Sequence, residues 1–169
     1  MEHEIFQAVR SGETARVSEL AEGFDLSEVD GNGRTVLYEA IIKGHTELAR
    51  FLIERGANVN HMDKNCQTPL HFAAMYKRLD IARMILEHGG DLSLADKQGN
   101  QPLWTSLMCC AQVPDLIRLF LEHGADMRHR NRFAAAPCDL VLRDGPYGWL
   151  MSQAHRPGAA PEPRRRFEL

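Results

Sequence analysis

Aspartates recur at intervals of 33 residues along this 169-residue chain, and each one opens a similar segment. They are Asp30, Asp63 and Asp96, and the middle segment reads Asp-Lys-Asn-Cys-Gln-Thr-Pro-Leu-His-Phe-Ala-Ala. The ends of the units also match, with a Glu-x-Gly-x-Asn/Asp pattern at 54–58, 87–91 and 122–126. A fixed period of this length indicates stacked units, none of which buries its apolar face alone. A chain built in this way is expected to work by presenting a surface.

The strongest local instance of the repeat is Thr68-Pro69-Leu70-His71, and three copies stand in register. On these residues the chain resembles the ankyrin-repeat family, whose unit reads D-x-x-G-x-T-P-L-H-x-A-A-x-x-G-H before a second apolar helix. The resemblance implies an all-α repeat solenoid, in which each unit has a β-hairpin finger and two antiparallel helices. The array is short, and its arginine-rich, alanine-rich composition is typical of GC-rich bacterial genomes.

We expect an ankyrin-repeat domain over residues 1–145. Three full repeats, at 30–62, 63–95 and 96–130, lie between two atypical end units. The N-terminal cap repeat, 3–29, lacks a finger, and 131–145 is a partial repeat. Residues 146–169 leave the pattern, and we expect a C-terminal cap segment followed by a flexible tail rich in arginine and proline.

Several positions predict local structure. Thr68 is expected to cap its helix through its hydroxyl, and Thr35 to do the same one repeat earlier. Gly56, Gly89 and Gly124 follow the second helices and are expected to adopt positive φ.

Other positions depart from the repeat. Cys66 stands where the finger turn has glycine, which predicts a strained or rearranged turn. Tyr38 replaces the motif histidine, and Lys77-Arg78 replaces Gly-His between two helices. The repeat at 96–130 is two residues longer than the two repeats before it, and the extra residues lie within 108–114.

Chemical motifs are missing from the sequence. It has no glycine-rich phosphate loop, no HExxH and no G-x-S-x-G, and its four cysteines lack metal or disulfide spacing. We therefore expect no enzyme activity, no cofactor and no bound metal. Apolar runs fall short of the ~20 residues that a membrane span needs. The N-terminus is acidic and unlike a signal peptide, which favours a cytoplasmic protein.

Charge is unevenly distributed, although the net charge is only −3. Residues 1–30 hold eight acids and two bases, whereas 127–169 hold four acids and eight bases. Such polarity can orient a partner. The alternative is a polar surface whose local imbalance has no role.

The resemblance also implies which residues meet a partner, because the family binds through its finger tips and a concave face of first helices. The finger positions are Arg34, Lys64, Gln67, Lys97, Asn100 and Arg132. The helix positions are Ile42, Lys43, Met75, Tyr76, Met108 and Cys109. Apolar side chains at exposed positions favour a partner; the alternative is that they pack on neighbouring helices or on the tail.

The sequence thus predicts a non-catalytic module that binds another protein. One version is an inhibitor or immunity protein of a bacterial toxin or enzyme. Alternatives are an adaptor or secreted effector that engages a host protein, and a nucleic-acid-associated regulator that uses the basic C-terminal end. The acidic net charge argues against nucleic acid. The identity of the partner and the oligomeric state stay open.

Overall fold

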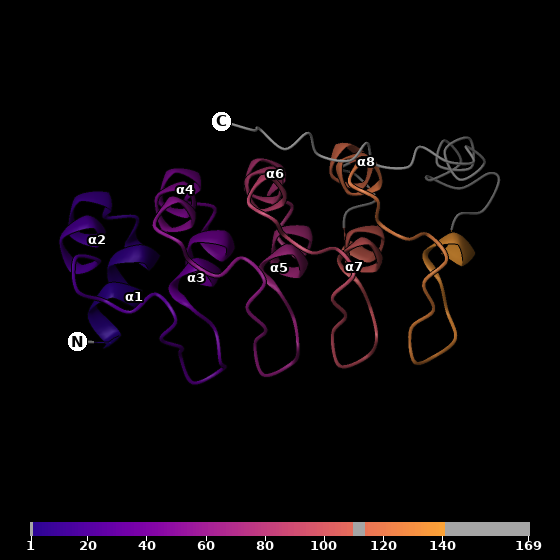
Figure 1. The fold of residues 1–169 in the computed structure, drawn as a ribbon, viewed down its shortest axis with the longest axis horizontal. Coiled ribbons are helices and arrows are strands. Elements are labelled where there is room, and N and C mark those ends of the chain that lie inside the picture. The colour runs from indigo at the N-terminus through magenta and orange to yellow at the C-terminus, as the bar shows by residue number, and fades with distance from the viewer. Residues whose placement is uncertain (1, 110–113, 141–169) are drawn as a thin grey trace, which may run out of the picture.

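Paired helices form a stack of similar units in the computed structural model, which describes residues 2–109 and 114–140 (Figure 1). The inner helices α1, α3, α5 and α7 lie side by side in one row, and the outer helices α2, α4, α6 and α8 form a second row. Loops that we call fingers, at 30–34, 63–67, 96–100 and 131–135, all project to the same side. The helices are α1 Glu2–Ser11, α2 Thr14–Leu20, α3 Val36–Lys43, α4 Thr46–Glu54, α5 Pro69–Met75, α6 Leu79–Glu87, α7 Pro102–Cys109 and α8 Pro114–Glu122, with a 3-10 helix η1 at Pro137–Leu140.

The two rows differ in how much of each helix is buried. Every residue of α5 from Pro69 to Ala74 is buried, because this helix is covered by α3, α6 and α7. The outer helix α4 instead buries one face, through Leu48, Ala49, Leu52 and Ile53. Apolar residues at helical spacing therefore form one continuous core between the rows. Burial of each large aliphatic side chain contributes about 1.5–3 kcal/mol.

The fingers are hairpin-shaped, but no strand occurs in the described residues, so β-hairpin pairing is not confirmed. In the second finger the backbone N–H of Asp63 donates to the carbonyl of Gln67, and that of Cys66 donates to the carbonyl of Asp63. The Asp63 Oδ1 atom then accepts from the N–H groups of Asn65 and Gln67. The aspartate side chain thus accepts hydrogen bonds from backbone N–H groups that would otherwise need partners in a paired strand.

A left-handed residue turns the chain at the tip of each finger. This residue is Gly33 in the first finger (φ 77°) and Gly99 in the third (φ 81°), but Cys66 (φ 59°) and Ala134 (φ 58°) occupy it in the others. The predicted strain at Cys66 is therefore present as backbone conformation, since a residue with a Cβ pays about 1–2 kcal/mol there. The glycines after the outer helices also have positive φ, as predicted.

The N-termini of two equivalent inner helices are capped differently. Thr68 and His71 form a reciprocal capping box at the start of α5. Thr35, at the start of α3, makes no such bond, and its Oγ1 is the buried side-chain polar atom without a hydrogen-bond partner among the described residues. The prediction for Thr35 was wrong, because the backbone N–H of Tyr38 donates to the Thr35 carbonyl at 3.0 Å and not to the hydroxyl.

The array ends in two atypical units. The first consists of α1 and α2, joined by a turn at Gly12 (φ 78°), with no finger before α1 in the described residues. The last described unit has a finger followed only by η1. Three expected segments lie outside the described residues. They are the C-terminal cap and tail at 146–169, the end of the partial repeat at 141–145, and most of the insertion within 108–114. Among the residues described, no helix is long and apolar enough to cross a membrane.

Candidate binding surface

The large apolar side chains that are most exposed to solvent lie on the finger side of the stack. They lie at the C-terminal ends of inner helices, in the fingers or directly before a finger: Val29, Met62, Met75, Tyr76, Met108 and Phe133. In the described part of the chain, none of them belongs to an outer helix. We call the fingers together with residues 42–43, 75–77 and 108–109 the finger face. It is the side on which apolar groups remain available for contact.

Tyr76 is held in place from beneath by a buried aromatic residue. Its ring stacks on that of Phe72, with centroids 6.2 Å apart and planes inclined by 19°. Phe72 in turn makes an edge-to-face contact with Tyr38, with ring centroids 4.9 Å apart. Because Tyr76 is 39 % exposed yet rests on this buried pair, it is a pre-positioned aromatic group that would lose little conformational entropy on binding.

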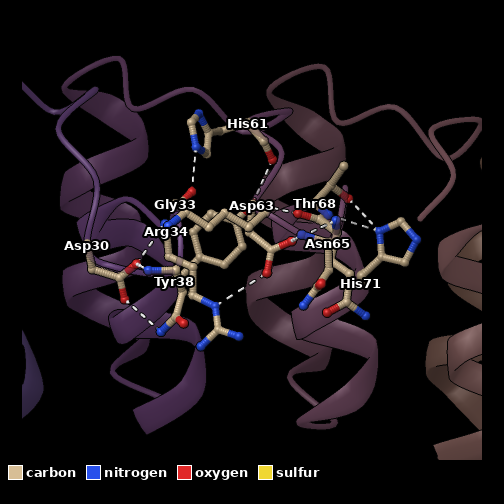
Figure 2. A network of polar contacts seen from close by, with 12 residues as sticks. Asp30, Gly33, Arg34, Tyr38, His61, Asp63, Asn65, Thr68 and His71 are labelled. Atoms are coloured by element: carbon tan, nitrogen blue, oxygen red, sulfur yellow. Dashed lines mark hydrogen bonds and ion pairs between the residues drawn. The ribbon is translucent and has the colours of Figure 1, made fainter. Parts of the chain in front are cut away.

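Arg34 is a finger residue whose half-buried side chain connects two fingers. Its Nε atom lies 3.4 Å from Oδ2 of Asp63 (Figure 2). Its guanidinium carbon lies 4.7 Å from the centroid of the Phe72 ring. The Asp63 side chain is only 1 % exposed, so this pair is largely removed from water. Arg34 therefore joins the first finger to the second, and an added role in partner binding stays a prediction.

Tyr38 performs the bridging role that the motif histidine has in the next repeat. Its hydroxyl lies 2.6 Å from the carbonyl of His61 and 2.8 Å from that of Gln67, and it can donate its proton to either one. Burial, and then the nearby Asp63 carboxylate, raise the pKa of Tyr38 far above its ordinary value, so the hydroxyl stays a donor. His61 completes the junction through Nε2, 2.8 Å from the carbonyl of Gly33 (Figure 2).

His71 links the second and third fingers in a single tautomer. Nδ1 accepts from the backbone N–H of Thr68 at 3.1 Å, so Nε2 must carry the proton that it donates to the carbonyl of Asn100 at 2.9 Å. Burial lowers the pKa of His71 below its ordinary value. This side chain therefore acts as a neutral structural bridge.

Consecutive fingers are also joined near their tips by one repeated backbone bond. The N–H groups of Lys64, Lys97 and Arg132 each donate to a carbonyl of the preceding finger, at 2.9–3.0 Å. These residues occupy equivalent positions, and all three are exposed. The bond aligns the fingers, so their side chains form an ordered row.

Most of the predicted partner-binding residues lie on the finger face and are exposed. These are Lys43, Lys64, Met75, Tyr76, Lys97, Met108, Cys109 and Arg132. Ile42 is half-buried and packs on the core, in agreement with the alternative of helix packing.

Gln67 and Asn100 are also half-buried, and Asn100 is tied to the framework. Its amide donates to Asp96 and accepts from Asn131. Partner binding by any of these predicted residues remains a proposal.

Sequence reasoning omitted three residues on this side of the molecule. Val29 and Met62 directly precede two fingers. An apolar residue at the same position of two repeats was the sequence feature that could have identified them. Lys77 follows Tyr76 with φ 59° and is exposed. Within the described residues, no group of three or more His, Cys, Asp or Glu side chains is placed to hold a metal ion.

Comparison with known families gives one match. The family model for ankyrin repeats, with three copies, matches residues 5–96, which is more than half of the chain. The match ends at the start of the third finger, so the later units are recognised from the internal repeat and the structure. None of the curated proteins matches this chain.

Proposed function

Because this chain belongs to the ankyrin-repeat family, whose repeats are generally protein-interaction modules, we propose that it binds a partner protein through its finger face. The observation that carries this proposal is the one-sided placement of exposed apolar side chains. An outer row without such groups and a finger side with several of them is the distribution expected when one side meets a partner.

The composition of the finger face also fits a binding surface. Met75, Tyr76 and Met108 lie at the ends of successive inner helices, and polar fingers flank them. Aromatic residues and methionine are enriched at protein interfaces, and a polar rim surrounds their apolar centre. Tyr76 is the best-supported anchor, because its stacking on Phe72 fixes its position before the partner arrives.

The test is partner capture with the double variant Met75→Ala/Tyr76→Ala. Loss of both anchors should weaken binding by at least ~2 kcal/mol, which is about 30-fold. The matched control is Arg83→Ala/Glu87→Ala, since both residues are exposed on the outer helix of the same repeat. Circular dichroism and urea unfolding would confirm that each variant folds. Equal affinity in the anchor variant and the wild type would contradict the proposal.

The consequence of binding is a finer proposal. A module without catalytic motifs acts on its partner by covering a surface, and this supports an inhibitor or immunity role. The adaptor and effector roles differ in that the partner keeps its activity when bound. Assay of the captured partner with and without a stoichiometric amount of this protein would separate these roles.

A further inference from the structure

Lysine is scarce in this chain, and all four lysines lie on the finger face. They are Lys43 at the end of α3, Lys64 and Lys97 in two fingers, and Lys77 after α5. All four are exposed. Arg132 occupies the position of Lys64 and Lys97 one finger further on, so three consecutive fingers carry a cation at the same place.

The carboxylates of the same surface point into the fingers, so the charged groups that a partner would touch directly are the cations. Asp63 and Asp96 are buried, and each accepts two backbone N–H bonds through Oδ1. Asp30 is half-buried and makes the same two bonds. Glu39 of α3 is paired with Arg10, and its side chain is 12 % exposed. The charge that this surface presents to solvent is therefore positive.

Three of the four outer helices, α4, α6 and α8, carry the opposite charge, whereas α2 is neutral. Each of α4, α6 and α8 has an exposed acid in its first turn, an arginine in its middle and an exposed glutamate at its end. Two acids and one base give each of these helices a net charge of −1. The stack is thus polarised from an acidic outer row to a cationic finger face.

We infer that the partner presents an acidic, extended protein segment to the finger face, with apolar residues that contact Met75, Tyr76 and Met108. This inference rests on the proposed function and adds the chemistry of the partner to it. Cations around exposed apolar groups complement carboxylates that flank apolar side chains. A nucleic-acid duplex fits less well, since its backbone phosphates would leave the methionines and Tyr76 without apolar contacts.

The spacing of the fingers sets the spacing of the carboxylates. Packed neighbouring helices are ~8–10 Å apart, so equivalent finger positions are separated by about the same distance. A polyproline II segment has three residues per turn and rises ~3.1 Å per residue, which places every third side chain on one side at ~9 Å intervals. Lys64, Lys97 and Arg132 would therefore meet acids at every third residue of such a segment.

The test is selection of binders from a displayed library of random 12-residue peptides on the full-length protein. The expected result is enrichment of Asp or Glu at three-residue spacing, together with an aliphatic or aromatic residue. One enriched peptide is then synthesised, and its affinity is measured for a set of variants. Lys64→Glu/Lys97→Glu should reduce its affinity at least ~10-fold at low salt, and Lys64→Arg/Lys97→Arg should retain it.

The matched control is Arg50→Glu/Arg83→Glu, which changes net charge equally but on the outer helices, where both arginines are exposed. It should bind like the wild type. Loss of affinity in this control equal to that of the lysine variant would overturn the inference, because the net charge and not the finger face would then govern binding.

The outcomes separate this inference from the proposed function. Peptides without acidic enrichment that still depend on Met75 and Tyr76 would overturn the acidic partner and support the binding face. Enriched peptides indifferent to both the lysine and the Met75/Tyr76 variants, or no binders at all, would overturn both.

Two further results would overturn the inference in favour of another occupant. One is tight, salt-sensitive binding of an oligothymidylate that the lysine variant loses and that displaces the peptide. The other is a dimer in sedimentation analysis that the lysine variant converts to monomer, since the acidic outer row of a second copy would then be the occupant.

Discussion

Cys66 shows how one side chain can oppose the conformation that its position requires. It lies at the tip of the second finger with φ 59°, where the neighbouring fingers have Gly33 and Gly99. The same region holds Lys77 with φ 59°, where the equivalent turns have Gly12 and Gly44. Left-handed backbone costs residues with a Cβ about 1–2 kcal/mol. The central repeat therefore carries two local penalties that the preceding repeat lacks.

Cys66→Gly should raise the free energy of unfolding by about 0.5–1 kcal/mol, because relief of the strain exceeds the added chain entropy of glycine. The matched control is Gly99→Ala, which should lower stability by about 1–2 kcal/mol. A Cβ at Gly99 would lie 3.0 Å from the backbone nitrogen of Arg132 in addition to adopting φ 81°. Urea unfolding measures both changes. A destabilised Cys66→Gly variant would show that the thiol contributes more than the backbone conformation costs.

Thr35 and Thr68 provide a second matched pair. Thr35→Val should change stability by less than about 0.5 kcal/mol, because its buried hydroxyl has no partner among the described residues. Thr68→Val should cost about 1–2 kcal/mol, since Thr68 forms the capping box with His71. Thermal unfolding of the two variants gives the comparison. Equal losses would mean that the Thr35 hydroxyl is satisfied in solution.

His71 predicts a loss of stability in mild acid. Burial lowers its pKa in the folded state, while the unfolded chain takes up a proton near pH 6.5. Stability is therefore complete above about pH 6.5 and falls as the pH drops towards the folded-state pKa, by up to ~1.4 kcal/mol per pH unit. His71→Gln should remove one proton from this dependence in urea titrations between pH 7 and 5. An unchanged slope in the variant would assign the acid sensitivity to other groups.

At the scale of elements, helix ends are completed by side chains from the following unit. Arg78 donates from Nε and a terminal nitrogen to the carbonyls of Ile41 and Ile42, at 3.1 and 3.0 Å. His45 places Nε2 3.3 Å from the carbonyl of Arg10 in the preceding junction. Arginine therefore substitutes for the motif histidine by reaching the exposed C-terminal carbonyls of α3. The residues at each junction thus supply hydrogen bonds to the C-terminal carbonyls of the preceding inner helix.

Element positions follow closely from the repeat pattern, whereas side-chain pairing does not. Pro69 and Gly56 mark a helix start and a helix end where the structure has them, because proline and glycine act through local backbone geometry. The N–H of Tyr38 donates to the Thr35 carbonyl and leaves the Thr35 hydroxyl without a cap. The Tyr38 side chain reaches the carbonyls of His61 and Gln67, and the second of these contacts crosses into the next repeat. Arg34 was predicted as a finger position that meets a partner, and its pairing with Asp63 was not foreseen. The partners of these side chains are determined by packing between units. The sequence of a single repeat does not contain that information.

The finger face was predictable as a set of positions, but its charge was not. Met75 and Tyr76 were expected at exposed positions from the resemblance, and the structure exposes both. The sequence shows acids and lysines at neighbouring finger positions, which predicts a finger face without net charge. Only the inward direction of Asp63 and Asp96 reveals that the lysines dominate the surface.

At the scale of the whole molecule, stability should depend on the junctions, because the main contacts between units in the described part of the chain join neighbouring units. Tyr38→Phe removes the hydroxyl that serves the carbonyls of His61 and Gln67, and it should cost about 1–3 kcal/mol. Since this hydroxyl joins the second repeat to the third, the loss should also uncouple the N-terminal units. Hydrogen exchange should then show amides of α1–α4 opening before those of α5 and α6, whereas the wild type opens these helices together. Uniform loss of protection along the whole array in the variant would mean that the remaining contacts, including Arg34–Asp63, hold the junction without Tyr38.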